Sequence, residues 1–269
     1  RISSTSGGAF WEIAYHFLAD GGIVVGSRYR KDWQSAEHAI ARSVEELLEI
    51  KGSKYFQSDT EGIYKAVKEE LIKGTKVLFC GTPCQIAAIK SFLGKEYVNL
   101  YCMDFICRSI NSPKAFKAYI EELEKEYNSK VVEVHLKNKK YGWQSLASQV
   151  KFDNGQESIR DKNQDWWVRG FIFNDLYTRE SCYNCQYKVL PRLNSDITIG
   201  DFWGIKDQNS VDMFKGISVL LINTKKGKQL FDQSKRAFEF KVHALEEVLP
   251  GNPALLKNPV RTDKQDKFF

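Results

Sequence analysis

The sequence predicts an α/β protein: a mixed sheet with βαβ units flanked by helices, plus a small N-terminal α/β lobe packed against it. A chain of 269 residues with 42% hydrophobic residues can bury a large core, in one domain or in two closely packed lobes. Short apolar runs of strand length alternate with stretches of helical periodicity, which is the pattern of βαβ units. We expect residues 1–73 to form the N-terminal lobe, residues 74–247 the main lobe, and residues 248–269 an irregular C-terminal tail.

The N-terminal lobe is expected to begin with an amphipathic helix over residues 9–20, where apolar side chains recur at helical spacing. The Ser- and Thr-rich residues just ahead of it supply N-cap chemistry, and Gly21 and Gly22 end the helix. A short strand over residues 23–26 follows.

The main lobe opens with a strand over residues 76–80, a helix over 85–93 and a second strand over 98–103. Crossovers of this kind are right-handed and make the two strands parallel, so the loops after both strands emerge at the same edge of the sheet. Cys84 and Cys107 follow these two strands. We therefore expect the two cysteines to be spatial neighbours.

The rest of the main lobe continues the alternation of helices and strands. Helices are expected over residues 112–127, 166–177 and 226–238. Strands are expected over residues 131–136, 196–200 and 218–222, with a hairpin turn at 153–155.

Composition excludes several classes of partner. The formal charge of +6 is spread over mixed basic and acidic residues, and the densest basic stretch, residues 137–140, is short. Specific nucleic-acid binding usually shows a concentrated basic footprint, so we expect no nucleic-acid partner. No apolar run approaches the roughly 18–20 residues that span a bilayer, so we expect a soluble protein with no membrane partner. A chain of this size does not need its six cysteines as disulfide staples, which favours a reducing, cytoplasmic setting. The sequence leaves open whether the protein forms a homo-oligomer.

Four cysteines form the main candidate for chemistry. Cys182 and Cys185 lie on one tight turn, where both thiolates can reach a single metal centre. Alone, this pair is also compatible with a zinc knuckle, a redox dithiol or two idle thiols. With Cys84 and Cys107, it gives four thiolates from three loops, which matches a 4Fe-4S cluster, although a structural zinc site would satisfy the same count.

Other reactive side chains are expected to have structural roles. Cys80 and Cys102 lie within apolar strands, where a cysteine behaves as a small buried hydrophobe. His16 falls on or beside the apolar face of the first helix, and His38 and His243 are expected on exposed helical stretches. None of these residues is assigned a catalytic role.

Three segments could contact a cofactor. Residues 3–8 precede a helix, and free amides at a helix start, helped by hydroxyls and glycines, suit a pyrophosphate; they could equally form an ordinary N-cap. Lys54 could meet a phosphate or the negative charge that develops on a reduced flavin, or lie solvated in its loop. Residues 196–204 end a strand with glycines and aromatics that could flank a ring system or pack in the core, and Trp143 could line a substrate side or belong to the core.

Six short motifs follow one another in a distinctive order. They are Ser6–Gly8, Gly52–Ser58, Gly81–Gln85, Asp104–Cys107, Cys182–Cys185 and Asp196–Gly204. In this order the sequence resembles the coenzyme F420 hydrogenase/dehydrogenase beta-subunit family, over roughly residues 3–224. At the two positions after Cys107, many members of that family carry His-Gly, whereas this chain has Arg108 and Ser109.

The resemblance implies FAD as cofactor and a 4Fe-4S cluster bound by Cys84, Cys107, Cys182 and Cys185. It implies a ferredoxin-like domain or protein as electron partner and a small-molecule redox substrate, either coenzyme F420 or another organic acceptor. The flavin contacts that it implies are Ser6, Gly7, Gly8, Gly52, Ser53, Lys54, Tyr55, Ser58, Thr82, Gln85, Asp201 and Trp203.

The functional hypothesis is a flavin-dependent iron-sulfur oxidoreductase, in which Lys54 and Asp201 are the polar catalytic residues at the flavin. The alternative is a zinc-stabilised binding or accessory protein without redox catalysis. Iron with acid-labile sulfide distinguishes the first from the second, for which zinc alone is expected.

Overall fold

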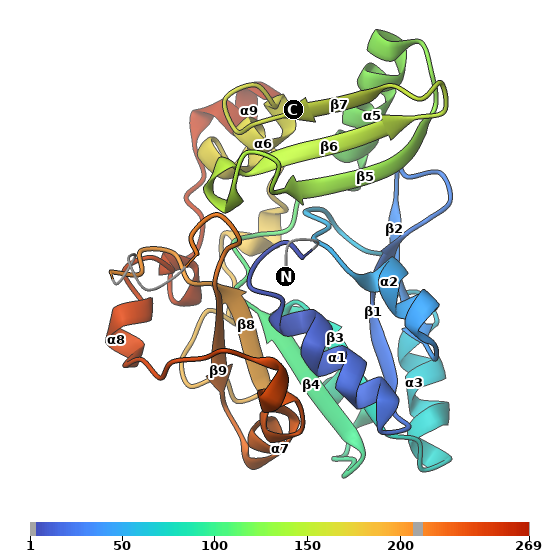
Figure 1. Ribbon diagram of the computed structural model, residues 1–269, viewed down its shortest axis with the longest axis vertical. Coiled ribbons are helices and arrows are strands. Elements are labelled where there is room, and N and C mark those ends of the chain that lie inside the picture. The colour runs from blue at the N-terminus through green and yellow to red at the C-terminus, as the bar shows by residue number, and fades with distance from the viewer. Residues whose placement is uncertain (1–3, 207–211, 269) are drawn as a thin grey trace.

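The protein is a mixed α/β structure with two sheets. The computed structural model describes residues 4–206 and 212–268. The larger sheet has six strands in the order β2-β1-β3-β4-β8-β9, and the smaller has three in the order β5-β6-β7 (Figure 1). The strands are β1 (Ile23–Tyr29), β2 (Ala36–Ala41), β3 (Val77–Gly81), β4 (Leu100–Phe105), β5 (Val131–Asn138), β6 (Ala147–Phe152), β7 (Glu157–Arg160), β8 (Ile197–Asp201) and β9 (Ser218–Ile222).

Helices cover both faces of the larger sheet. The α-helices are α1 (Ala9–Ala19), α2 (Val44–Ile50), α3 (Ile63–Ile72), α4 (Pro83–Leu93), α5 (Pro113–Tyr127), α6 (Trp166–Val168), α7 (Lys225–Ser234), α8 (Leu245–Val248) and α9 (Asp263–Phe268). Among the described residues, no helix is long and apolar enough to cross a membrane. The predicted mixed sheet with flanking helices is confirmed.

The central strands β1, β3, β4 and β8 are parallel, and the edge strands β2 and β9 are antiparallel to their neighbours. The predicted βαβ unit is present as β3-α4-β4, with Val77 paired to Leu100. Because parallel strands end at one edge of a sheet, the segments that follow β3, β4 and β8 emerge side by side. This edge carries the candidate site.

Alternating side chains of the strands enter two separate cores. On β3, Val77 and Phe79 pack beneath α3 and α4. Leu78 lies on the opposite face of the sheet, in the core that includes residues of α1, α2 and α7. This alternation, with period two, is what a strand covered on both faces requires.

Residues before the expected boundary at 73 belong to the same larger sheet. They contribute β1 and β2, and β1 pairs directly with β3. The division of the chain into 1–73, 74–247 and 248–269 stays a prediction.

The smaller sheet and α5 enclose a third core (top of Figure 1). Phe116 of α5 stacks on Phe56 with ring centroids 3.9 Å apart, and Trp167 meets Phe116 edge to face at 5.2 Å. Asp165 is fully buried here and accepts a hydrogen bond from Tyr119 Oη at 2.9 Å. This core holds the segment around Tyr55 and Phe56 against the larger sheet.

Two local predictions about helices were wrong. The hydroxyl N-cap expected for α1 is replaced by Gly8, at φ 99°, and no side chain of the described residues caps the helix. The helix expected over residues 166–177 stops early, because α6 passes into a π-helical turn over Arg169–Phe173 and Asp175 follows at φ 49°.

The C-terminal tail is more ordered than predicted. It contains a 3₁₀ turn, Pro253–Leu255, and the short helix α9. Gln265 of α9 is buried, donates to Thr178 O at 2.9 Å and accepts from Tyr183 Oη at 2.6 Å. The tail therefore packs against the segment that carries Cys182 and Cys185.

The prediction of an exposed, helical His38 was wrong: the residue is buried in β2. Its ring stacks on Phe79 with centroids 5.6 Å apart, and its Nδ1 lies 2.9 Å from Ser58 Oγ. Burial lowers the pKa of His38 to about 4. Because the unfolded chain binds a proton near pH 6.5 and the folded protein does not, this histidine destabilises the fold as pH falls below about 6.5.

We predict that the wild-type protein loses about 2 kcal/mol more stability than the variant His38→Gln between pH 7 and pH 5. Urea unfolding at the two pH values measures the difference, and the constant offset between the variants cancels. An equal loss in both proteins would show that His38 does not titrate in this window.

Candidate functional site

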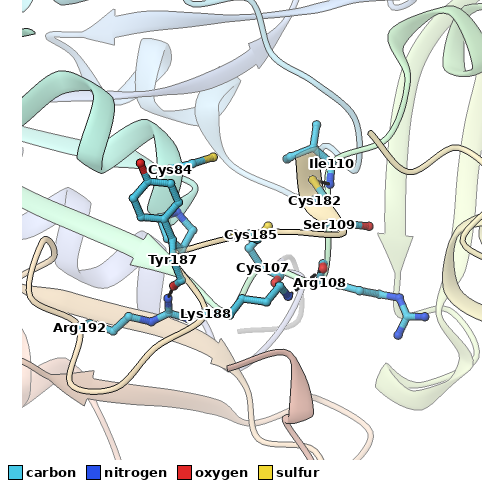
Figure 2. A pocket seen from close by; sticks show the side chains of 11 residues that line it. Cys84, Cys107, Arg108, Ser109, Ile110, Cys182, Cys185, Tyr187, Lys188 and Arg192 are labelled. Atoms are coloured by element: carbon cyan, nitrogen blue, oxygen red, sulfur yellow. Dashed lines mark hydrogen bonds between the residues drawn. The ribbon is translucent and has the colours of Figure 1, made fainter. Parts of the chain in front are cut away.

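Four cysteines surround one cavity at the strand-end edge of the larger sheet. Cys84 lies in the first turn of α4, and Cys107 follows the end of β4. Cys182 ends a short 3₁₀ turn and Cys185 comes three residues later. All four line the cavity, and Figure 2 shows them around the same space. Their role as metal ligands stays a prediction.

The position of Cys84 is set by the start of α4. Thr82 accepts from the backbone N–H of Gln85, and the Gln85 side chain accepts from the Thr82 N–H at 2.9 Å, which forms a capping box. Pro83 occupies the first helical position, where its missing N–H costs nothing. Thr82 Oγ1 lies 3.0 Å from Cys84 Sγ. Thr82 and Gln85 therefore support the helix start that carries Cys84, and their expected role as flavin contacts stays a prediction.

One backbone donor and two cations lie around the thiols. The Ile110 N–H donates to Cys182 Sγ at 3.4 Å. Lys188 Nζ donates to Cys107 O at 2.7 Å and to Arg108 O at 2.9 Å, and it lines the cavity together with Arg192. Sequence reasoning missed both cations, because nothing local distinguishes a buried Lys or Arg from a solvated one.

Burial raises the pKa of the Cys107 thiol; the Lys188 ammonium lowers it, and the neighbouring thiolates of Cys84, Cys182 and Cys185 raise it. Mutual repulsion of this kind is expected where several thiolates face one space without a bound cation. Four thiols at one cavity therefore disfavour one another's thiolate forms unless a cation is bound.

A single zinc ion bound by all four thiols would require their sulfurs to lie close together. Zinc at about 2.3 Å from each sulfur would bring the sulfurs within about 3.8 Å of one another. Among the described residues, no three His, Cys, Asp or Glu side chains are placed to hold one metal ion. All six cysteines are free, and Cys80 and Cys102 do not line the cavity.

A second polar group lies at the end of β8. Asp201 forms an ion pair with Lys137 of β5 and accepts from Trp143 Nε1 at 3.0 Å. Trp143 and Trp203 stack with centroids 4.2 Å apart and planes 2° apart, and Lys137 Nζ lies 4.9 Å from the centre of the Trp203 ring. Lys137 is buried, and sequence reasoning missed it because a short basic run is more often solvated.

The N-terminal segment lies against this group. Ser6 Oγ donates to Ile217 O at 3.0 Å, and Lys139 Nζ donates to Ser6 O at 2.6 Å. A Cβ at Gly7 would stand 2.6 Å from Ser218 N, so only glycine fits there. Ser3, where the expected motif begins, lies outside the described residues.

The Lys54 side chain binds backbone carbonyl groups close to it in the sequence. Its Nζ donates to the carbonyl oxygens of Ile50 at 2.8 Å and Lys51 at 3.0 Å, at the end of α2. Burial lowers its pKa to about 7, whereas carbonyl oxygens at a helix C-terminus favour the ammonium form. Burial raises the pKa of Tyr55, and the Asp201 carboxylate raises it further.

Three other expected flavin residues have surroundings of their own. Gly52, at φ 89°, and Ser53 lie in the same loop as Lys54. Ser58 is buried and bound to His38. The structure therefore gathers Ser6, Gly7, Asp201 and Trp203 in one region, with Thr82 and Gln85 beside the cysteines.

The two groups adjoin through a close backbone contact. Ile106 N donates to Ile199 O at 2.8 Å, and a Cβ at Gly200 would lie 2.5 Å from Ile106 Cδ1. Gly200 precedes Asp201, and Ile106 precedes Cys107. The cysteine cavity and the Asp201 group are therefore neighbours along one sheet edge.

Residues 74–248 match the family model that describes the C terminus of the coenzyme F420 hydrogenase/dehydrogenase beta subunit. The chain belongs to this beta-subunit family. The match spans the four cysteines and the Asp201 group, so the candidate site lies within the region that shows the membership.

A solved structure supports the fold of the family member. The chain is similar to one from the F420-reducing [NiFe] hydrogenase complex of Methanosarcina barkeri, with 18% identity and a TM-score of 0.60, covering 98% of this chain and 84% of that one. No curated protein matches the sequence. The membership indicates an oxidoreductase of the hydrogenase/dehydrogenase beta-subunit type.

Proposed function

We propose that the chain is an FAD- and 4Fe-4S-dependent oxidoreductase that passes electrons between an iron-sulfur partner and a small organic molecule. The observation that carries this proposal is the arrangement of four free cysteines around one cavity, next to the Asp201 group on the same sheet edge. A 4Fe-4S cluster exchanges single electrons, and a flavin exchanges hydride as well as single electrons.

Cys84, Cys107, Cys182 and Cys185 would hold the cluster. Thiolates are the ligands that iron-sulfur clusters select, and each of the three loops is fixed independently. The capping box fixes Cys84, the pairing of β4 and β8 fixes the start of the Cys107 loop, and the contacts of α9 fix the Cys182–Cys185 turn. Such supported ligands keep the cavity open for a cluster.

FAD would lie along the N-terminal segment and the Asp201 group. No side chain of the described residues caps the start of α1, so its first backbone N–H groups are free to bind a phosphate. Near the ring, the chain offers the polar pair Lys137 and Asp201 and the aromatic Trp203. Lys54, which has partners of its own, would act there through its charge.

The electron partner in this proposal is a ferredoxin-like domain or protein, in a reducing, cytoplasmic setting. The organic substrate is a small redox molecule, and coenzyme F420 is one candidate for it. Fold likeness to one chain of a hydrogenase complex does not select among such substrates.

We predict that Cys182→Ser abolishes the visible absorption of the cluster in anaerobically purified protein and lowers iron and acid-labile sulfide together. Cys102→Ser is the matched control, because Cys102 is buried in β4 away from the cavity. An unchanged spectrum and iron content in Cys182→Ser would refute the ligand assignment. Stoichiometric zinc without sulfide in the wild-type protein would instead support the zinc-stabilised alternative.

Two variants of Gly8 that differ in charge test the flavin site. A Cβ at Gly8 would meet only Ser4 Oγ, at 3.5 Å, and Asn and Asp tolerate its positive φ better than other residues. We expect Gly8→Asp to bind FAD at least about tenfold more weakly than Gly8→Asn, because a carboxylate would repel the phosphates at the start of α1.

The comparison separates binding from folding, since Asp and Asn are both good N-cap residues. Titration of flavin-free protein with FAD, followed by fluorescence quenching, gives the two dissociation constants. Equal constants would move the pyrophosphate away from α1 and leave the cysteine assignment untouched.

A further inference from the structure

The cavity wall contains a buried guanidinium that the described residues leave partly unsatisfied. Arg192 is 4% exposed and lines the cavity with the four cysteines (Figure 2). Its Nη1 donates to Tyr187 O. Its Nε and Nη2 are buried and have no hydrogen-bond partner among the residues that the structure describes.

The lack of partners for these Arg192 donors needs an explanation, because a guanidinium keeps its charge in a protein and carries five N–H donors. A buried charged donor without an acceptor destabilises the fold, because it has lost its hydration and gained no hydrogen bond in return. A fold retains such a group when a bound acceptor completes it. The missing partner of Arg192 is therefore an acceptor, and an anionic one is favoured.

Lys188, the other cation at the cavity, provides a contrast. Its Nζ donates to three carbonyl oxygens, those of Cys107, Arg108 and Ala254, at 2.7, 2.9 and 3.2 Å. All three of its donors are used, so Lys188 serves to hold the backbone together. Arg192, by contrast, has N–H groups that no acceptor of the described residues binds.

Asp104 is an acidic side chain that interacts with Arg192. Burial raises the pKa of the Asp104 carboxyl, and the side chains of Thr198 and Ser195 and then the Arg192 charge oppose this rise. Within the described residues the two form no ion pair, and Asp104 Oδ1 is itself buried without a partner there. Asp104 therefore interacts with the charge of Arg192 but, among the described residues, accepts none of its N–H groups.

We propose that Arg192 donates its spare N–H groups to the anionic iron-sulfur centre and thereby raises the centre's reduction potential. This inference rests on the proposed cluster. Four thiolates give such a centre a net negative charge that grows by one unit when it gains an electron. A fixed cation and its hydrogen bonds stabilise the reduced form more than the oxidised form, so Arg192 is a positioning and tuning residue rather than a ligand.

The test is the midpoint potential of the cluster in the purified holoprotein, measured by anaerobic redox titration with dithionite and mediators. We expect Arg192→Gln to lower the potential by at least about 59 mV, which is a tenfold change in the ratio of reduced to oxidised cluster at fixed potential. Arg192→Lys should lie between the two, because an ammonium retains the charge but lacks the planar fork. Arg236→Gln, on the exposed turn after α7, is the matched control and should leave the potential unchanged.

The outcomes are distinguishable. Unshifted potentials in both Arg192 variants, with wild-type iron and sulfide content, overturn the inference and assign Arg192 to the support of Asp104. If Arg192→Gln does not fold, Arg192→Lys decides, since a lowered potential supports the inference and an unchanged one overturns it. Absence of iron from the wild-type protein would overturn the proposed function itself, and the inference with it.

Discussion

The parallel pairing of β3, β4 and β8 is the constraint on which the candidate site depends. Because these strands run in one direction, residues about 20 to 120 positions apart in sequence leave the sheet at the same edge. This pairing brings Cys84, Cys107 and Asp201 to that edge. The third cysteine segment has no strand of its own and is held by side chains, through Tyr183 and Gln265. The tail thus contributes to the cavity from the opposite end of the chain.

A second constraint joins the two sheets. Lys137 comes from the smaller sheet and Asp201 from the larger, and their ion pair is enclosed by Trp143 and Trp203. Breaking a buried pair by removing one partner typically costs about 3–5 kcal/mol, because the other charge is left without compensation. The same pair gives the region beside the cysteines a fixed polar group. Stability and candidate chemistry therefore depend on the same side chains, and a variant at Asp201 would confuse the two.

The larger features of the fold were predictable because they follow local rules. Two apolar runs, separated by Thr82, Pro83 and an apolar helical stripe, predict the β3-α4-β4 unit. The observed bounds of the three elements agree with the predicted ones to within a few residues. The partners of single polar side chains were not predictable in this way. Lys54 and Lys137 look alike in the sequence, yet one caps α2 and the other is buried against Asp201. Long-range packing decides such roles, and neither composition nor spacing records it.

Charge gives the cavity its chemical character. Thiolates in one space repel one another, and burial alone would keep them protonated. A metal centre would favour the thiolate forms, because it supplies positive charge at close range. The two cations at the cavity, Lys188 and Arg192, have different surroundings. Lys188 fixes the carbonyl oxygens of the Cys107 loop, whereas Arg192 retains donors that face no protein acceptor among the described residues. A cavity built only to hold a neutral set of thiols would gain nothing from an unsatisfied guanidinium. In our proposal, the negative charge that satisfies it belongs to an iron-sulfur centre coordinated by the four thiolates.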